Sequence, residues 1–129
     1  MLLISASVRP SPIHGLGCFT NEKIKKGQKV WVYDKRIDLS IPVSELSSLP
    51  EPIQAFLNMY GYVKIDQGEK VLILCGDHSK HMNHSSEPNV LEAGDPDQAN
   101  VAARDIEAGE ELTCDYYSFD LDVGHKFSQ

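Results

Sequence analysis

Residues 13–19 form the first of three short segments whose residue types could bind a ligand. The segment reads IHGLGCF and places Gly15 and Gly17 one residue apart. Because glycine has no Cβ, the backbone at these positions can approach a ligand closely. Most such glycine pairs are only turns, and this one lacks the third glycine of a dinucleotide-binding motif. By itself the segment predicts a tight bend, with ligand binding as the second interpretation.

Residues 81–89, which read HMNHSSEPN, form the second candidate segment. Asparagine and serine side chains bond to nearby backbone and so compete with regular structure. Pro88 holds Glu87 in an extended conformation. We therefore expect a stiff, polar, irregular loop. Within it, Asn83 offers both a donor and an acceptor, a combination that suits the edge of an adenine ring.

A metal site is a rival interpretation of the same region. Cys75, His78, His81 and His84 are spaced three residues apart, and all four side chains are of types that bind zinc. That spacing aligns side chains only in a helix, and the glycine, aspartate and serine between them disfavour one. Structural zinc sites also pair their ligands across a longer gap. The sequence therefore favours no metal, with zinc binding as the alternative.

Residues 109–117, which read GEELTCDYY, form the third segment. Its two adjacent tyrosines, Tyr116 and Tyr117, follow an acidic stretch. The simplest interpretation is a pair of packed aromatic rings with their hydroxyls in water. A hydroxyl that acts at a site is the alternative.

Short strands separated by turns must position these segments. We expect strands at residues 2–8, 18–20, 28–34, 62–65, 70–74, 101–104 and 111–117, the first ended by the prolines of residues 9–12. Ser44 is expected to cap a short helix that runs through Leu49. Pro50 and Pro52 mark the start of a second helix, with apolar residues at helical spacing through Tyr60. The predicted fold class is mostly β with short helices (α+β), built from several small sheets.

Length and charge narrow the classes of partner. The 129 residues suit one domain, residues 1–129. Residues 1–86 carry ten basic and eight acidic side chains and residues 87–129 carry two and eleven, which together give the net charge of −7. An acidic surface repels phosphates and attracts cations. We therefore expect a lysine-containing basic protein or peptide as partner and no direct nucleic acid binding.

The location in the cell is predicted from what the chain contains. No apolar run approaches the roughly 18 residues that a membrane-spanning helix needs, and the start lacks the basic region of a signal peptide. Three widely spaced cysteines indicate reduced thiols rather than a disulfide framework. We expect a soluble intracellular protein of the cytoplasm or nucleus, with no membrane contact.

Taken together and in this order, the three segments resemble the SET-domain family. Residues 13–19 resemble its first motif, and the Lys26-Gly27 turn follows as in the family. Residues 83–89 resemble its asparagine-histidine motif, and residues 111–116 resemble its terminal motif. The resemblance covers residues 5–36 and 78–120, and residues 37–77 correspond to a variable insert.

The resemblance implies a SET-domain fold of the β-clip type with a knot-like crossing near its C-terminus. It also implies methyl transfer from S-adenosylmethionine to a lysine ε-amino group of a histone or other basic protein, without a metal. Tyr116 would supply the catalytic hydroxyl, and Tyr60 or Tyr62 would be a further cofactor contact. The residues that resemble cofactor contacts are His14, Gly15, Leu16, Gly17, Asn83, His84 and Tyr116.

Two further expectations follow from the segments that the family often carries and this chain lacks. The chain has no cysteine-rich zinc segment before or after the motifs. A homodimer is one way to complete the lysine channel. A non-catalytic SET fold that serves as a protein-binding module is the alternative function.

The implied chemistry requires a dry channel. A free lysine has a pKa of about 10.4, so about one in 2,500 is a neutral nucleophile at pH 7. Burial disfavours the ammonium and lowers that pKa. The amine must then meet the methyl group in line, with the reacting atoms about 3 Å apart.

Overall fold

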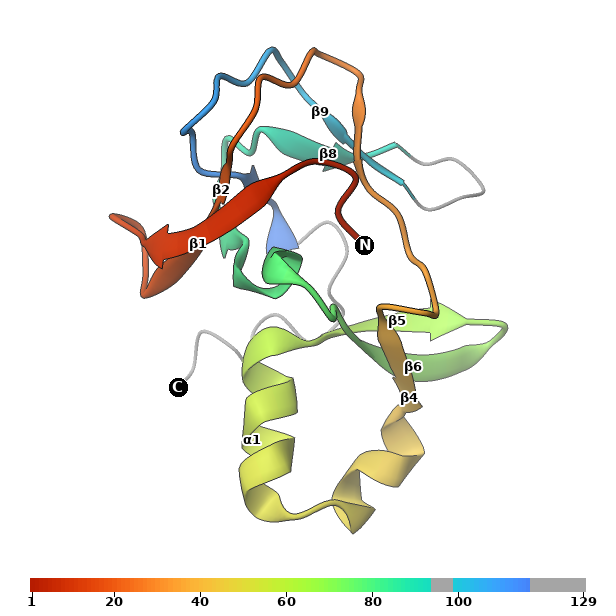
Figure 1. Cartoon of the computed structure of the whole chain (residues 1–129). Helices are drawn as coiled ribbons and strands as arrows, with labels where there is room; N and C mark the ends of the chain where they lie inside the picture. The colour runs from red at the N-terminus through yellow and green to blue at the C-terminus, as the bar shows by residue number, and fades with distance from the viewer. Residues whose placement is uncertain (94–98, 117–129) are drawn as a thin grey trace.

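The computed structural model describes residues 1–93 and 99–116, and their fold is mostly β with few short helices (Figure 1). The helices are η1 (Val43–Ser48), α1 (Glu51–Tyr60) and η2 (His78–His81). The strands are β1 (Ala6–Pro10), β2 (Leu16–Thr20), β3 (Lys29–Trp31), β4 (Leu39–Pro42), β5 (Tyr62–Asp66), β6 (Glu69–Leu74), β7 (Asn83–His84), β8 (Val90–Glu92), β9 (Asn100–Ala102) and β10 (Thr113–Cys114).

The strands form four small sheets, as the sequence predicts. β1 and β2 are an antiparallel pair, and the three-stranded sheets have the orders β3-β9-β8 and β4-β6-β5. The fourth sheet pairs β7 with β10 in parallel, with Asn83 opposite Thr113 and Cys114 opposite His84. This pair brings the second and third sequence segments together. The predicted knot-like crossing involves the terminal segment of the chain, of which residues 117–129 lie outside the described part.

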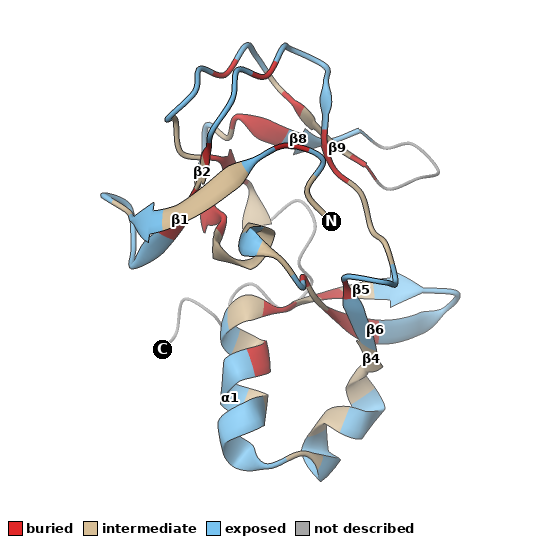
Figure 2. Ribbon diagram, viewed as in Figure 1, coloured by how far each residue is buried: buried red, intermediate tan, exposed pale blue. Residues whose placement is uncertain are grey.

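Two hydrophobic clusters divide the described residues (Figure 2). The larger one lies among the sheets that carry the three segments, and its fully buried members include Ile24, Ile106 and Leu112. The smaller one joins α1 to the β4-β6-β5 sheet through Leu57 and Leu72. Residues 39–74, within the predicted variable insert, thus have a small cluster of their own, and the rest of the described chain surrounds the larger one.

The hairpin and the second helix fold as their local sequences dictate. Gln67 and Gly68 connect β5 to β6 with φ values of 51° and 80°, the left-handed pair that a two-residue turn requires. Pro50 precedes α1, Pro52 lies in its first turn, and the helix ends at Gly61. A Cβ at Gly61 would lie 2.6 Å from Cδ2 of Leu72, so glycine lets the end of the helix pack closely on β6.

Several predicted boundaries are wrong. β1 covers Ala6–Pro10 rather than residues 2–8. Pro10 can end this strand because β1 lies at the edge of its sheet, where the backbone N–H that proline lacks is not needed for pairing. The strand expected at 28–34 shortens to β3, and that expected at 101–104 becomes β9, Asn100–Ala102. Ser44 is not the helix cap: η1 is preceded by Pro42, without a side-chain cap bond. β4 and β8 were not predicted, since their pairing partners lie far along the chain.

The helices that the structure describes include none that is both long and apolar enough to span a membrane.

The three cysteines are buried, and none of them forms a disulfide bond in the structure. Burial, with Asp77 and Glu111 nearby, raises the pKa of the Cys18 thiol to about 12. Burial likewise raises the pKa of Cys75 to about 11. Because only the thiolate reacts, the reactive fraction of both groups at pH 8 is small.

We therefore expect slow alkylation of Cys18 and Cys75 by iodoacetamide at pH 8 in the folded protein. Denaturant should speed labelling of both by at least about 100-fold, because unfolding restores ordinary thiol pKa values. Peptide mass spectrometry over time reads each cysteine separately. Equal labelling rates at Cys75 in the folded and unfolded protein would contradict the buried assignment.

Candidate functional site

Asn89 ties the terminal segment to the loop that precedes it. Its amide nitrogen donates to the carbonyl of Glu111 at 2.8 Å, and its Oδ1 accepts from the backbone N–H of Thr113 at 2.8 Å. The backbone N–H of Asn89 donates to the Thr113 hydroxyl at 3.2 Å. Asn89 is 4% exposed. This buried amide replaces strand pairing where β10 begins, and so sets the position of the residues that follow.

Asn83 joins the first segment to the second. Its Nδ2 lies 3.0 Å from the carbonyl oxygen of His14, 3.1 Å from that of Leu16 and 2.9 Å from Oε2 of Glu111. Two N–H donors are thus shared among three acceptors. The Oδ1 of Asn83 accepts no hydrogen bond from the residues that the structure describes. The group of Asn83 that stays available for a further hydrogen bond is therefore its acceptor oxygen.

Glu111 is a site residue that the sequence motifs did not single out. Both of its carboxylate oxygens lie 2.8 Å from the hydroxyl of Ser11, and Oε2 also accepts from Asn83. The same Ser11 oxygen accepts from the backbone N–H of Ile13 at 2.9 Å. One carboxylate therefore holds both ends of the first segment's bend. The sequence shows Glu111 within the GEELT stretch. It does not reveal the role of Glu111, because the hydrogen-bond partners Asn83 and Ser11 lie 28 and 100 residues away along the chain.

Gly17 makes room for that carboxylate. A Cβ at Gly17 would lie 2.9 Å from Cδ of Glu111 and 3.0 Å from Cβ of Ser11. Close approach thus explains this glycine without a ligand. Gly15 is different, because it has a φ of 46° and open space around it, so the backbone there is accessible.

We expect Gly17→Ala to lower the free energy of unfolding by about 1–3 kcal/mol, because the methyl group displaces the Glu111 carboxylate from its two donors. Urea unfolding measures the change. In a Glu111→Ala background the same substitution should cost less, since the clash with the carboxylate is gone and only the close contact with Cβ of Ser11 remains. If Gly17→Ala lowers the free energy of unfolding equally in the two backgrounds, the contact between Gly17 and Glu111 is not the cause of the loss.

Tyr116 is held at two points. Its hydroxyl donates to the carbonyl of Met82 at 2.6 Å, and its backbone N–H donates to Nδ1 of His84 at 3.1 Å. The rings of His84 and Tyr116 pack with their centroids 5.5 Å apart. Because Nδ1 of His84 accepts this bond, neutral His84 carries its proton on Nε2. His84 thus orients Tyr116 through the backbone.

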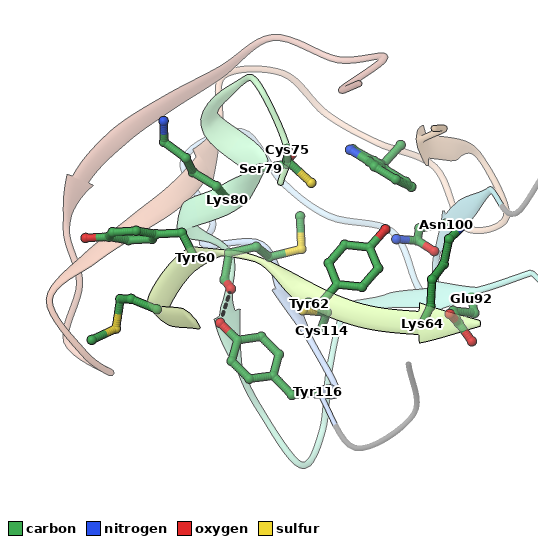
Figure 3. Close-up of a pocket in the computed structure, with 13 residues that line it drawn as sticks. Tyr60, Tyr62, Lys64, Cys75, Ser79, Lys80, Glu92, Asn100, Cys114 and Tyr116 are labelled. Atoms are coloured by element: carbon green, nitrogen blue, oxygen red, sulfur yellow. Dashed lines mark hydrogen bonds between the residues drawn. The ribbon is translucent and has the colours of Figure 1, made fainter. Parts of the chain in front are cut away.

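A pocket of about 110 Å³ lies beside the Tyr116 ring (Figure 3). Its walls are largely aromatic and sulfur-containing, with polar groups at its edges. Tyr60 and Tyr62 both line it, and which of them would contact the cofactor stays a prediction. The lining residues are Trp31, Met59, Tyr60, Tyr62, Lys64, Cys75, Ser79, Lys80, Met82, Glu92, Asn100, Cys114 and Tyr116.

The buried part of the pocket disfavours charge. Burial raises the pKa of the Tyr62 hydroxyl well above its usual range. Burial also raises the pKa of Glu92, although nearby Lys64 acts in the opposite direction. Among the described residues, the buried side-chain atom without a hydrogen-bond partner is Nε1 of Trp31. A charged amine that enters such a space loses hydration, which favours its neutral form.

The structure connects the predicted site residues into one network. His14 and Leu16 contact Asn83, Gly17 packs against Glu111, and Asn83 leads through β7 to His84 and Tyr116. The first segment does not line the pocket, which Tyr116 does. Tyr116 is therefore the predicted residue that both regions share.

The zinc alternative finds no support in this arrangement. Cys75 lines the pocket, but no group of three or more histidine, cysteine, aspartate or glutamate side chains within residues 1–93 and 99–116 is placed to hold a metal ion. His84 is instead engaged with the backbone of Tyr116.

Comparison with solved structures identifies the architecture as that of SET-domain methyltransferases. One match is a humanized mutant of the Chaetomium thermophilum Polycomb Repressive Complex 2 bound to an inhibitor, with a TM-score of 0.68 and 20% identity over 95% of this chain and 16% of that one. Another is a proposed histone methyltransferase of Plasmodium falciparum, with a TM-score of 0.61 and 22% identity over 89% of this chain and 95% of that one. These likenesses confirm the predicted fold class.

The SET domain family model matches residues 15–117, and the chain belongs to that family. A curated relative is the histone-lysine N-methyltransferase MEDEA of Arabidopsis thaliana, which is 29% identical over 113 residues. The alignment covers 82% of this chain but 16% of MEDEA.

Proposed function

We propose that this chain is a protein-lysine N-methyltransferase that uses S-adenosylmethionine and acts on a histone or other basic protein. The observation that carries the proposal is the position of Tyr116. Its ring lines the pocket, and its backbone is bound to the segment that carries Asn83 and His84. A residue so placed can act where a cofactor on one side meets an amine on the other.

The residues around Asn83 suit the adenosine end of this cofactor. Ile13 and Leu16 expose apolar surface, at 51% and 48%. The backbone at Gly15 is open, and Asn83 offers an acceptor that matches the exocyclic N–H of adenine. His14, Gly15, Leu16, Gly17, Asn83 and His84 would hold the cofactor, and Gly17 would do so indirectly through Glu111.

The bound cofactor would supply an electrophilic methyl group on a positively charged sulfur. The pocket walls would strip water from the incoming lysine and favour its neutral amine. That amine would accept the methyl group, and the methylated ammonium would then lose a proton to solvent. The Tyr116 hydroxyl, fixed on the Met82 carbonyl, would orient the reacting groups.

Label transfer tests the proposal. Purified protein is incubated with methyl-labelled S-adenosylmethionine and with histones, ribosomal proteins and lysine peptides. We expect label on lysine, located by peptide mass spectrometry. If no lysine substrate acquires label while a known methyltransferase labels the same mixture, the proposed activity is wrong.

The alternative function is a non-catalytic SET fold that binds another protein. Calorimetry separates the two: measurable binding of S-adenosylmethionine that is lost in Asn83→Ala favours the enzyme. The homodimer and the soluble intracellular location stay predictions.

A further inference from the structure

Charged side chains lie at two ends of the pocket that Tyr116 lines. Figure 3 shows Lys64, Glu92 and Asn100 at one end, and Lys80 with Tyr60 at the other. Lys64 acts on the pKa of Glu92, so opposite charges offset each other at the first end. Among the residues that the structure describes, none of the pocket-lining side chains at the second end is a carboxylate.

Lys80 makes no ion pair with any described carboxylate. Its ammonium lies 5.9 Å from the ring centroid of Phe56, and Phe56 packs on Tyr60 at 5.0 Å. Aromatic faces attract a cation but do not neutralise it. Burial, together with Lys80 and His78, holds the pKa of His81 below its usual range. Neutral His81 therefore adds little charge at pH 7, and Lys80 is the principal cation of this rim.

The side chain of Lys80 points away from the place where methyl transfer would occur. In Figure 3 its amino group points away from Tyr62 and Tyr116, over the Tyr60 side of the pocket. A cation there cannot meet the target amine, which would be repelled. It can meet residues next to the target lysine, because extended peptides advance about 3.3 Å per residue.

We infer that Lys80 binds a carboxylate of the substrate, an aspartate or glutamate within about three residues of the target lysine. The inference rests on the proposed function. It goes against the preference that the net charge of −7 implies, since that charge favours uniformly basic partners. We expect Lys80 to outweigh the net charge in selecting the residues beside the target lysine. An ion pair at the rim acts over a few ångströms, whereas distant charges are screened by salt.

The test compares pairs of single-lysine peptides that carry glutamate or glutamine at one position from three before to three after the lysine. At low ionic strength the wild type should favour the best glutamate peptide by about three- to fivefold in kcat/KM. Lys80→Met, which keeps the aliphatic stem, should remove the preference. Lys25→Met, at an exposed turn away from the pocket, should retain it.

Two outcomes overturn the inference: an equal glutamate preference in wild type and Lys80→Met, or no glutamate preference at any position. If Lys80→Met instead raises KM for S-adenosylmethionine and leaves peptide preference unchanged, Lys80 serves the cofactor and the inference is wrong. If the protein methylates no lysine, the proposed function fails separately. Fluorescence anisotropy with the same labelled peptides then compares Kd values. An equal glutamate preference in wild type and Lys80→Met, or no glutamate preference at any position, again overturns the inference.

Discussion

Tyr116→Phe is expected to lower kcat for lysine methylation by about 100-fold or more while leaving the fold and the affinity for S-adenosylmethionine nearly unchanged. The substitution removes one oxygen, and with it the bond of 2.6 Å to the Met82 carbonyl. The ring keeps its packing on His84, but no hydroxyl remains to orient the reacting groups. Misplacement of a reacting group by about 1 Å can cost 100-fold in rate.

Single-turnover label transfer measures the effect on chemistry, and calorimetry measures cofactor affinity separately. Loss of one net hydrogen bond should lower the free energy of unfolding by about 1 kcal/mol. A rate within threefold of the wild type would show that the hydroxyl does not act in the reaction. Loss of activity together with loss of cofactor binding would assign the Tyr116 hydroxyl to cofactor binding instead.

Glu111→Ala is the second large change that we expect. It removes the acceptor shared by Ser11 and Asn83 and leaves the bend of residues 11–17 without its anchor. Hydrogen bonds to charged groups contribute about 1.5–3 kcal/mol each, and the lost partners gain access to water in part. We expect the free energy of unfolding to fall by about 2–3 kcal/mol, with weaker cofactor binding because its backbone contacts are no longer preorganised.

Glu107→Ala is the matched control. Glu107 is also a carboxylate near a turn, but its ion pair with Lys23, at 3.7 Å, joins side chains that are 68% and 57% exposed. Such surface pairs contribute little, so this variant should stay close to the wild type in urea unfolding and in calorimetry. Glu111→Gln, which keeps one acceptor oxygen, should fall between the two. Equal effects of Glu111→Ala and Glu107→Ala would contradict the anchoring role.

Local sequence determined the features that depend on neighbouring residues. The Gln67-Gly68 turn follows from two left-handed backbone positions, and α1 follows from the prolines at its start and its apolar spacing. The three segments likewise carry their own bends and side-chain types. That is why the family and the fold class could be predicted before any contact was known, and why candidate site residues could be named.

Only the tertiary structure decided what those residues touch. β4 and β8 are short and become strands because distant partners pair with them. Glu111 is one acidic residue in an acidic stretch until the fold brings Ser11 and Asn83 to it. The same packing explains why Gly17 must be glycine and why the amide nitrogen of Asn83 is already bonded.

The pocket shows the same division. Tyr116 could be found from its motif, but Trp31, Met82 and Glu92 come from separate elements without any shared pattern in the sequence. Local propensities specify turns and the types of side chain available. Burial, charge pairing and pocket walls arise from contacts between distant segments, and these contacts exist only after the chain has folded.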